Sequence, residues 1–107
     1  MSQSNSEGPV KPHSLLTDYD VHLFREGRHL RIYEKLGSHC ITLEGVDGVQ
    51  FAVWAPSAKE VRLIGSFNDW NRESHVLFPR LDSSGIWEGF VAGIKSGDIY
   101  KYLIISD

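Results

Sequence analysis

The stretch from Val61 to Trp70 reads VRLIGSFNDW and predicts a strand that ends in an exposed turn. Its first residues follow the two-residue period of a strand. The glycine, serine, asparagine and aspartate that come next are residues that turns favour. Outward from this stretch, strand and turn signals alternate over residues 39–107, and we therefore expect an all-β fold there.

Trp70 stands at the tip of this polar turn, where a large ring is difficult to bury completely. The flat apolar face of an indole suits the C–H face of a sugar ring, and the Asn68 amide could bond sugar hydroxyl groups. Two alternatives stay open. First, the loop over residues 71–75 could cover the Trp70 ring. Second, Asn68 and Asp69 could serve as turn formers that bond local backbone amides, and for these two residues we favour this role over sugar contact.

Composition restricts the kind of protein. The chain has 107 residues, enough for one domain, and its formal net charge of −3 is not that of a typical nucleic-acid-binding protein. Its one cysteine, Cys40, allows no internal disulfide, and no apolar run approaches the roughly 20 residues of a membrane span. Residues 1–9 lack the apolar core of a signal peptide, so we expect a cytoplasmic protein without nucleic-acid or membrane partners.

Three segments are expected along the chain. Residues 1–13 are rich in Ser, Gly and Pro and predict a disordered tail, and residues 14–38 predict a helical lead-in. Within the lead-in, Thr17 or Asp18 can cap a helix that Gly27 ends, and a second short helical piece spans residues 30–36. In the helix, Tyr19 and Leu23 share one face, and the helix must dock on something to be stable.

Residues 39–107 predict an antiparallel β-sandwich. The expected strands cover residues 40–44, 50–55, 61–66, 76–81, 86–92 and 99–105. Asp47-Gly48 is the expected turn of the first hairpin, and Pro79 weakens the fourth strand. No partner for the apolar last strand follows before Asp107, so we expect a sandwich that is incomplete at its C-terminal edge, as in a chain cut from a longer protein.

An ordered series of motifs resembles a known family. The series comprises Tyr33 to His39, Val53 to Ala58, Val61 to Trp70, Gly85 to Glu88, and Tyr100 to Tyr102. It is similar to a family-48 carbohydrate-binding module and, more closely, to the amino-terminal region of bacterial glycogen branching enzymes, over roughly residues 17–107. This resemblance implies an immunoglobulin-like sandwich packed beside a catalytic TIM-type barrel.

The resemblance also implies where the chemistry lies. A branching enzyme cuts an α-1,4-glucan chain and rejoins it through an α-1,6 bond, using carboxylates that belong to the barrel. The chain is far too short to contain that barrel. We therefore expect no branching activity, no catalytic residues and no cofactor in this chain, which would position the barrel and bind α-1,4-glucan weakly.

Related modules in the β subunit of AMP-activated protein kinase bind glycogen through two tryptophans and a lysine. The resemblance places the first tryptophan at Trp70 and the lysine at Lys101, while the second tryptophan would lie beyond Asp107. Lys101 stands between Tyr100 and Tyr102 and should point away from the face that those rings share. The alternative for Lys101 is an exposed lysine without a ligand. The alternatives for the whole chain are a purely structural scaffold and a stand-alone glycogen-sensing module.

Other residues invite functional interpretations that we do not favour. Trp54 and Trp87 lie inside predicted strands, where packing in the core or on a sheet surface is the better interpretation. His39 beside Cys40 lacks the second pair of ligands that a metal site needs. The remaining histidines are expected at the surface: His13, His22, His29 and His75.

Overall fold

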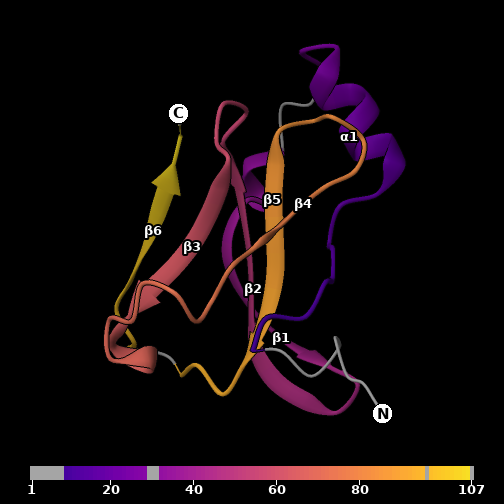
Figure 1. Cartoon of the computed structure of the whole chain (residues 1–107). Helices are drawn as coiled ribbons and strands as arrows, with labels where there is room; N and C mark the ends of the chain where they lie inside the picture. Colours follow the sequence, from indigo (N-terminus) through magenta and orange to yellow (C-terminus); the bar gives the residue numbers. More distant parts are fainter. Residues whose placement is uncertain (1–8, 29–31, 96, 107) are drawn as a thin grey trace, which may run out of the picture.

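Two antiparallel β-sheets pack against each other, and the N-terminal lead-in covers the outer side of the larger sheet in the computed structural model (Figure 1). The structure describes residues 9–28, 32–95 and 97–106. The larger sheet has the strand order β1-β2-β5-β4, and the smaller one pairs β3 with β6. The strands are β1 (Gly37–Leu43), β2 (Val46–Trp54), β3 (Glu60–Gly65), β4 (Phe78–Pro79), β5 (Ile86–Ala92) and β6 (Tyr100–Ile105). The predicted all-β sandwich is thus confirmed.

The first hairpin turns three residues earlier than the sequence predicts. Leu43 pairs with Val46, so Glu44 and Gly45 form a two-residue turn, with φ angles of 53° and 83°. The predicted turn at Asp47-Gly48 is wrong, because both residues lie within β2. Gly48 is needed there for close packing instead, since a Cβ atom at this position would lie 2.4 Å from the Val91 carbonyl oxygen.

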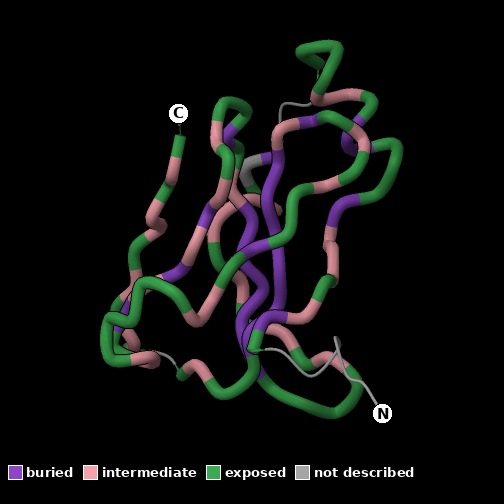
Figure 2. The backbone as a smooth tube through the Cα atoms, in the orientation of Figure 1, coloured by how far each residue is buried: buried purple, intermediate pink, exposed green. Residues whose placement is uncertain are grey.

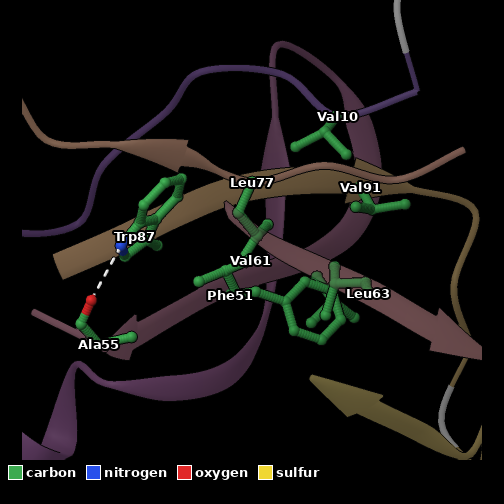
Figure 3. Packing of buried hydrophobic residues seen from close by; sticks show 9 residues of the cluster. Val10, Phe51, Ala55, Val61, Leu63, Leu77, Trp87 and Val91 are labelled. Carbon is green, nitrogen blue, oxygen red and sulfur yellow. Dashed lines mark hydrogen bonds between the residues drawn. The ribbon is translucent and has the colours of Figure 1, made fainter. Parts of the chain in front are cut away.

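The core lies between the two sheets and draws on alternate residues of β2, β3 and β5. Strand β5 is buried from Ile86 to Val91, and the middle of β2 is buried from Gly48 to Ala52 (Figure 2). Phe51 of β2 faces Val61 and Leu63 of β3, and all three are fully buried. Trp87 is buried as expected, and its Nε1–H donates to the Ala55 carbonyl oxygen at 3.2 Å (Figure 3).

A short segment after residue 75 connects both sheets. Val76 forms a bridge with Arg62 of β3 in the smaller sheet, whereas Phe78 and Pro79 pair with β5 in the larger one. Between them, Leu77 donates its N–H to the Val61 carbonyl oxygen and is buried in the core. Pro79 is accommodated because β4 lies at a sheet edge, where a missing N–H costs little.

The lead-in forms a helix with the predicted ends. Helix α1 (Asp18–Arg25) is capped by Thr17, whose side chain accepts from the Asp20 backbone N–H, and Gly27 adopts a φ of 72° after it. The helix docks through Val21, which is 4% exposed, whereas Tyr19 remains 68% exposed. The second helical piece is a 3₁₀ turn, η2 (Ile32–Glu34), and residues 30 and 31 lie outside the described residues.

The lead-in covers the outer side of the larger sheet with a separate apolar cluster. Its buried members are Leu16, Val21, Ile32, Ala52 and Ile86. Trp54 lies on this same side, 53% exposed, with its ring edge-on to Phe24 at 5.6 Å. The prediction that Trp54 packs on a sheet surface is confirmed.

Ordered contacts begin at residue 10, within the segment that the sequence predicts to be a disordered tail. Val10 is 5% exposed and belongs to the core between the sheets, and Lys11 exchanges two backbone hydrogen bonds with Phe90 of β5. Gly89 makes this contact possible, because a Cβ atom there would lie 2.4 Å from Val10 Cγ1. The disorder expected through residue 13 is therefore wrong for residues 10 and 11, since their partners in β5 are distant in sequence.

A buried ionic cluster fastens the start of the lead-in to β5. Arg80 donates to Asp82 Oδ2 at 2.8 Å, to Ser14 Oγ at 2.7 Å and to Glu88 Oε2 at 3.2 Å. Burial raises the pKa of the Glu88 carboxyl, although Ser14 and Arg80 act against this. Burial has the same tendency at Asp82, but hydrogen bonds from Arg80 and Ser84 outweigh it and lower that pKa. The lead-in is therefore attached by hydrogen bonds between Ser14 and charged side chains as well as by apolar contact.

Candidate functional site

The turn that carries Trp70 has a well-defined backbone. It follows β3 as a 3₁₀ turn, η3 (Ser66–Asn68), after which Asp69 and Trp70 both adopt left-handed conformations with φ of 56° and 60°. The Trp70 N–H donates to the Gly65 carbonyl oxygen at 2.8 Å. Non-glycine residues with positive φ persist only where their surroundings hold them. Here the backbone holds an indole that is 44% exposed.

Asn68 fixes this turn from the inside. Its Oδ1 accepts the Gly65 N–H at 3.0 Å, and its Nδ2 donates to the Leu63 carbonyl oxygen at 3.1 Å. Further acceptors around Nδ2 lie on Asn71, Ser74 and His75, at 3.1–3.4 Å. These internal partners support the turn-forming role of Asn68 over direct contact with a ligand.

Ser66 connects the same turn to the start of β6. Its backbone N–H donates to the Ile99 carbonyl oxygen at 2.9 Å, and its Oγ accepts the Ile99 N–H at 3.0 Å. The Ser66 hydroxyl also lies 3.3 Å from Asp98 Oδ1. The turn after β3 and the start of β6 are therefore held together at one end of the smaller sheet (Figure 1).

Lys101 lies at this end of the smaller sheet as well. It pairs with Ile64, while the neighbouring Tyr100 pairs with Gly65, the residue that anchors Trp70. Tyr100 and Tyr102 turn inward, and their rings meet Phe51 edge-on at 5.0 and 6.4 Å. Lys101 therefore points to the opposite face, where it is exposed. The pairing brings Trp70 and Lys101 to one end of one sheet.

His75 is part of the site, although its sequence context predicts a surface residue. Its ring is partly buried edge-on against Phe67 at 5.2 Å, and its Nδ1 lies 2.6 Å from Ser74 Oγ and 3.1 Å from Asn68 Nδ2. Burial lowers the pKa of the imidazole. No sequence signal points to this role, because the contact depends on how the loop after Trp70 folds back. His29 lies outside the described residues.

Two alternatives to the Trp70 turn, a surface hollow and a metal site, do not supply a second candidate site among the described residues. A hollow of about 430 Å³ is lined by Pro12, His13, Ser14, Phe78, Pro79, Arg80, Leu81 and Glu88, so it lies by the lead-in and not at Trp70. Within residues 9–28, 32–95 and 97–106, no group of three or more His, Cys, Asp or Glu could hold a metal ion. In the same part of the chain, no helix is long and apolar enough to cross a membrane.

Replacing Gly65 with alanine should disrupt the turn that carries Trp70. A Cβ atom there would lie 2.3 Å from the Ile99 carbonyl oxygen and 2.8 Å from Phe67 Cε1. Because the first contact is with backbone, we expect a loss of about 1–3 kcal/mol in the free energy of unfolding. Urea denaturation measures it. In the control Gly93→Ala, the new Cβ atom meets nothing within 4 Å and costs only strain at a φ of 82°. A Gly65→Ala variant as stable as the native chain would contradict this packing.

Comparisons with known proteins give one matching family and a group of similar bacterial proteins. The family described as carbohydrate-binding module 48 (isoamylase N-terminal domain) matches residues 35–107. Three bacterial proteins named 1,4-alpha-glucan branching enzyme GlgB are similar: 57% identical over 93 residues in Aromatoleum aromaticum, 55% over 89 in Thermosynechococcus vestitus and 53% over 95 in Aquifex aeolicus. These matches cover 87%, 83% and 89% of the chain but only 14%, 11% and 15% of the respective relatives.

Proposed function

The chain belongs to the carbohydrate-binding module 48 family, and from this premise we propose that it is the non-catalytic N-terminal module of a glycogen branching enzyme. In this role it positions the catalytic barrel and binds α-1,4-glucan weakly. The observation that carries the binding part is the exposed Trp70 indole on a turn whose backbone is held at Gly65. The exposed thiol of Cys40 fits a reducing compartment, and we place the protein in the cytoplasm.

In the proposed complex, the Trp70 indole stacks on a glucose ring and Lys101 donates to a sugar hydroxyl. Stacking on one ring contributes about 0.5–1.5 kcal/mol, and the entropy lost on association opposes it. The affinity of the chain alone for a linear maltooligosaccharide should accordingly be weak, about millimolar. Asn68 has a positioning role in this proposal, because its amide is already engaged within the turn.

A supporting role without sugar binding is the second candidate. The observation in its favour is the apolar surface beside the lead-in, where Leu81 is 99% and Phe78 40% exposed. Both residues line the hollow formed with Pro12 and Pro79. A larger protein could cover this surface, and in that case Trp70 would have no ligand.

Replacing Trp70 with alanine should weaken maltoheptaose binding about tenfold, because the stacking surface is lost. The measurement is a titration followed by amide chemical shifts, with shifts expected at residues 66–71 and around Lys101. Trp54→Ala is the matched control, since Trp54 is also about half exposed but lies on the other sheet. Equal binding by the Trp70 variant and the native chain would refute stacking. The absence of shifts at high millimolar sugar would leave the supporting role.

A further inference from the structure

The side chains of Asn68 and His75 form a hydrogen-bond network whose polarity is fixed at one end. Asn68 Oδ1 accepts the Gly65 N–H, and a backbone N–H can only donate. The amide of Asn68 therefore cannot exchange its oxygen and nitrogen without placing two donors together. As a result, Nδ2 must face the Leu63 carbonyl oxygen and His75 Nδ1, each at 3.1 Å.

This orientation favours one protonation state of His75. Because Asn68 Nδ2 can only donate, its 3.1 Å contact with His75 Nδ1 is a hydrogen bond only when Nδ1 presents a lone pair, which it does when the proton lies on Nε2. Ser74 Oγ completes the network, 2.6 Å from Nδ1 and 3.4 Å from Asn68 Nδ2, since a hydroxyl can donate to the first and accept from the second. A doubly protonated imidazole would lose the Asn68–His75 hydrogen bond, because its Nδ1–H would donate to Ser74 Oγ and leave the Asn68 amide with the Leu63 and Asn71 carbonyl oxygens.

The network is joined by backbone hydrogen bonds to the residues that hold Trp70. Gly65 contributes its N–H to Asn68 and its carbonyl oxygen to Trp70 N–H, and Asn71 N–H donates to the Asn68 carbonyl oxygen at 3.0 Å. Asp69 and Trp70, with positive φ, lie between these anchors. Loss of the Asn68 anchor should release the backbone strain and with it the orientation of the ring.

We propose that Asn68 and His75 are positioning residues for glucan contact at Trp70, and that the neutral imidazole is the form that holds the turn. This inference rests on the proposed function, because it assigns the groups that orient the ring of the same site. Neither residue touches the sugar in it.

The surroundings of His75 contain few groups that could replace the imidazole as the titrating group. The η3 turn contributes Phe67 and Asn68, and β3 contributes Leu63, whose N–H donates to the His75 carbonyl oxygen. Arg62 of β3 is already bound to the Glu60 carboxylate and the Arg72 carbonyl oxygen. The ionisable residues of the turn and the loop that follows it are Asp69, Arg72 and Glu73.

The test is maltoheptaose binding by the 107-residue chain at pH 7.5 and pH 5.5, with folding at both pH values verified by thermal melting. We expect the native affinity to fall about three- to tenfold at the lower pH, as one buried hydrogen bond is lost. His75→Gln should abolish this pH dependence, because glutamine does not titrate. His22→Gln is the matched control, since His22 is exposed on α1 beside Glu26, and it should behave like the native chain.

Asn68→Asp gives a result that a merely structural role would not produce. Aspartate keeps the acceptor for the Gly65 N–H but presents its second oxygen both to His75 Nδ1 and to the Leu63 carbonyl oxygen, and the second contact is unfavourable at any pH. The carboxylate favours the protonated imidazole. This variant should therefore bind weakly at pH 7.5 and recover only part of the loss towards pH 5.5, so that its pH trend is the reverse of the native one. Asn71→Ala, which removes an exposed amide that accepts only the Glu73 N–H, is its control.

Three outcomes separate this inference from the proposed function. Suppose that Trp70→Ala weakens binding as expected. If His75→Gln then keeps the native pH dependence, or Asn68→Asp binds like the native chain at both pH values, the positioning role is overturned and the proposed function stands. If Trp70→Ala binds like the native chain, the proposed function fails. The positioning role is then decided by ¹⁵N relaxation of Asp69 and Trp70, which must show greater mobility at pH 5.5 in the native chain but not in His75→Gln.

Discussion

Replacing Arg80 with methionine is expected to lower the free energy of unfolding at pH 7 by about 3–5 kcal/mol, the cost typical of breaking a buried ion pair from one side. The side chains of Arg80 and Glu88 are only 12% and 10% exposed. Without the guanidinium, the Glu88 carboxylate stays buried, and among the described residues the Ser14 hydroxyl is the hydrogen-bond donor that remains to it. Urea denaturation followed by tryptophan fluorescence measures the loss.

The pH dependence of this loss has a definite sign. Removing Arg80 raises the pKa of Glu88 in the folded state further above its ordinary value of 4.5. The folded variant then binds a proton that the unfolded chain binds less tightly, so the stability lost at pH 7 is partly regained as the pH falls towards 4.5. Adding Glu88→Gln should restore stability at pH 7. Arg28→Met, at a 63% exposed side chain, is the control, and equal effects of the two arginine variants would disprove the buried pair.

Replacing Phe51 with alanine should cost about 3–5 kcal/mol, as is typical of removing a large ring from a packed core. Phe51 is fully buried and supports Tyr100 and Tyr102, the residues on either side of Lys101. We therefore expect the variant to loosen β6 as well as to unfold at lower urea concentration. Amide hydrogen exchange in β6 reports the first effect and denaturation the second.

Phe78→Ala removes the same ring from a position that is 40% exposed. It should cost about 1 kcal/mol or less, because little apolar area returns to water. Phe51 and Phe78 variants of similar stability would show that the core between the sheets is not where the folding free energy is concentrated.

The first hairpin shows which part of the fold the sequence can predict. Two dipeptides near it contain glycine, Glu44-Gly45 and Asp47-Gly48, and Asp-Gly is the stronger turn signal. The structure uses Glu44-Gly45, because Gly48 must lie against β5, some 43 residues later, where a Cβ atom would also lie 2.6 Å from Phe90 Cζ. Local patterns identify the strands, whereas this packing depends on a contact that only the folded chain creates.

In the candidate site as well, some features follow from local sequence patterns and others depend on contacts between distant segments. The exposure of Trp70 and the outward direction of Lys101 follow from a polar turn and a two-residue period, and the structure agrees with both. That Trp70 and Lys101 lie at the same end of one sheet does not follow from local sequence patterns, because the segments that carry them are joined by the contact between Ser66 and Ile99, which are 33 residues apart. His75 could not be identified from the sequence, since its role depends on an amide orientation that Gly65 determines.

The family match begins at residue 35, yet the buried contacts begin at Val10. Anyone transplanting the module into another enzyme at the family boundary would therefore leave the lead-in behind. The side of the larger sheet that carries Ala52 and Ile86 would then be exposed to solvent. The position beside Gly89 that Val10 fills would be vacant. The unit that folds is larger than the segment that the family model matches, and a transplant that is to keep these contacts should start no later than residue 9.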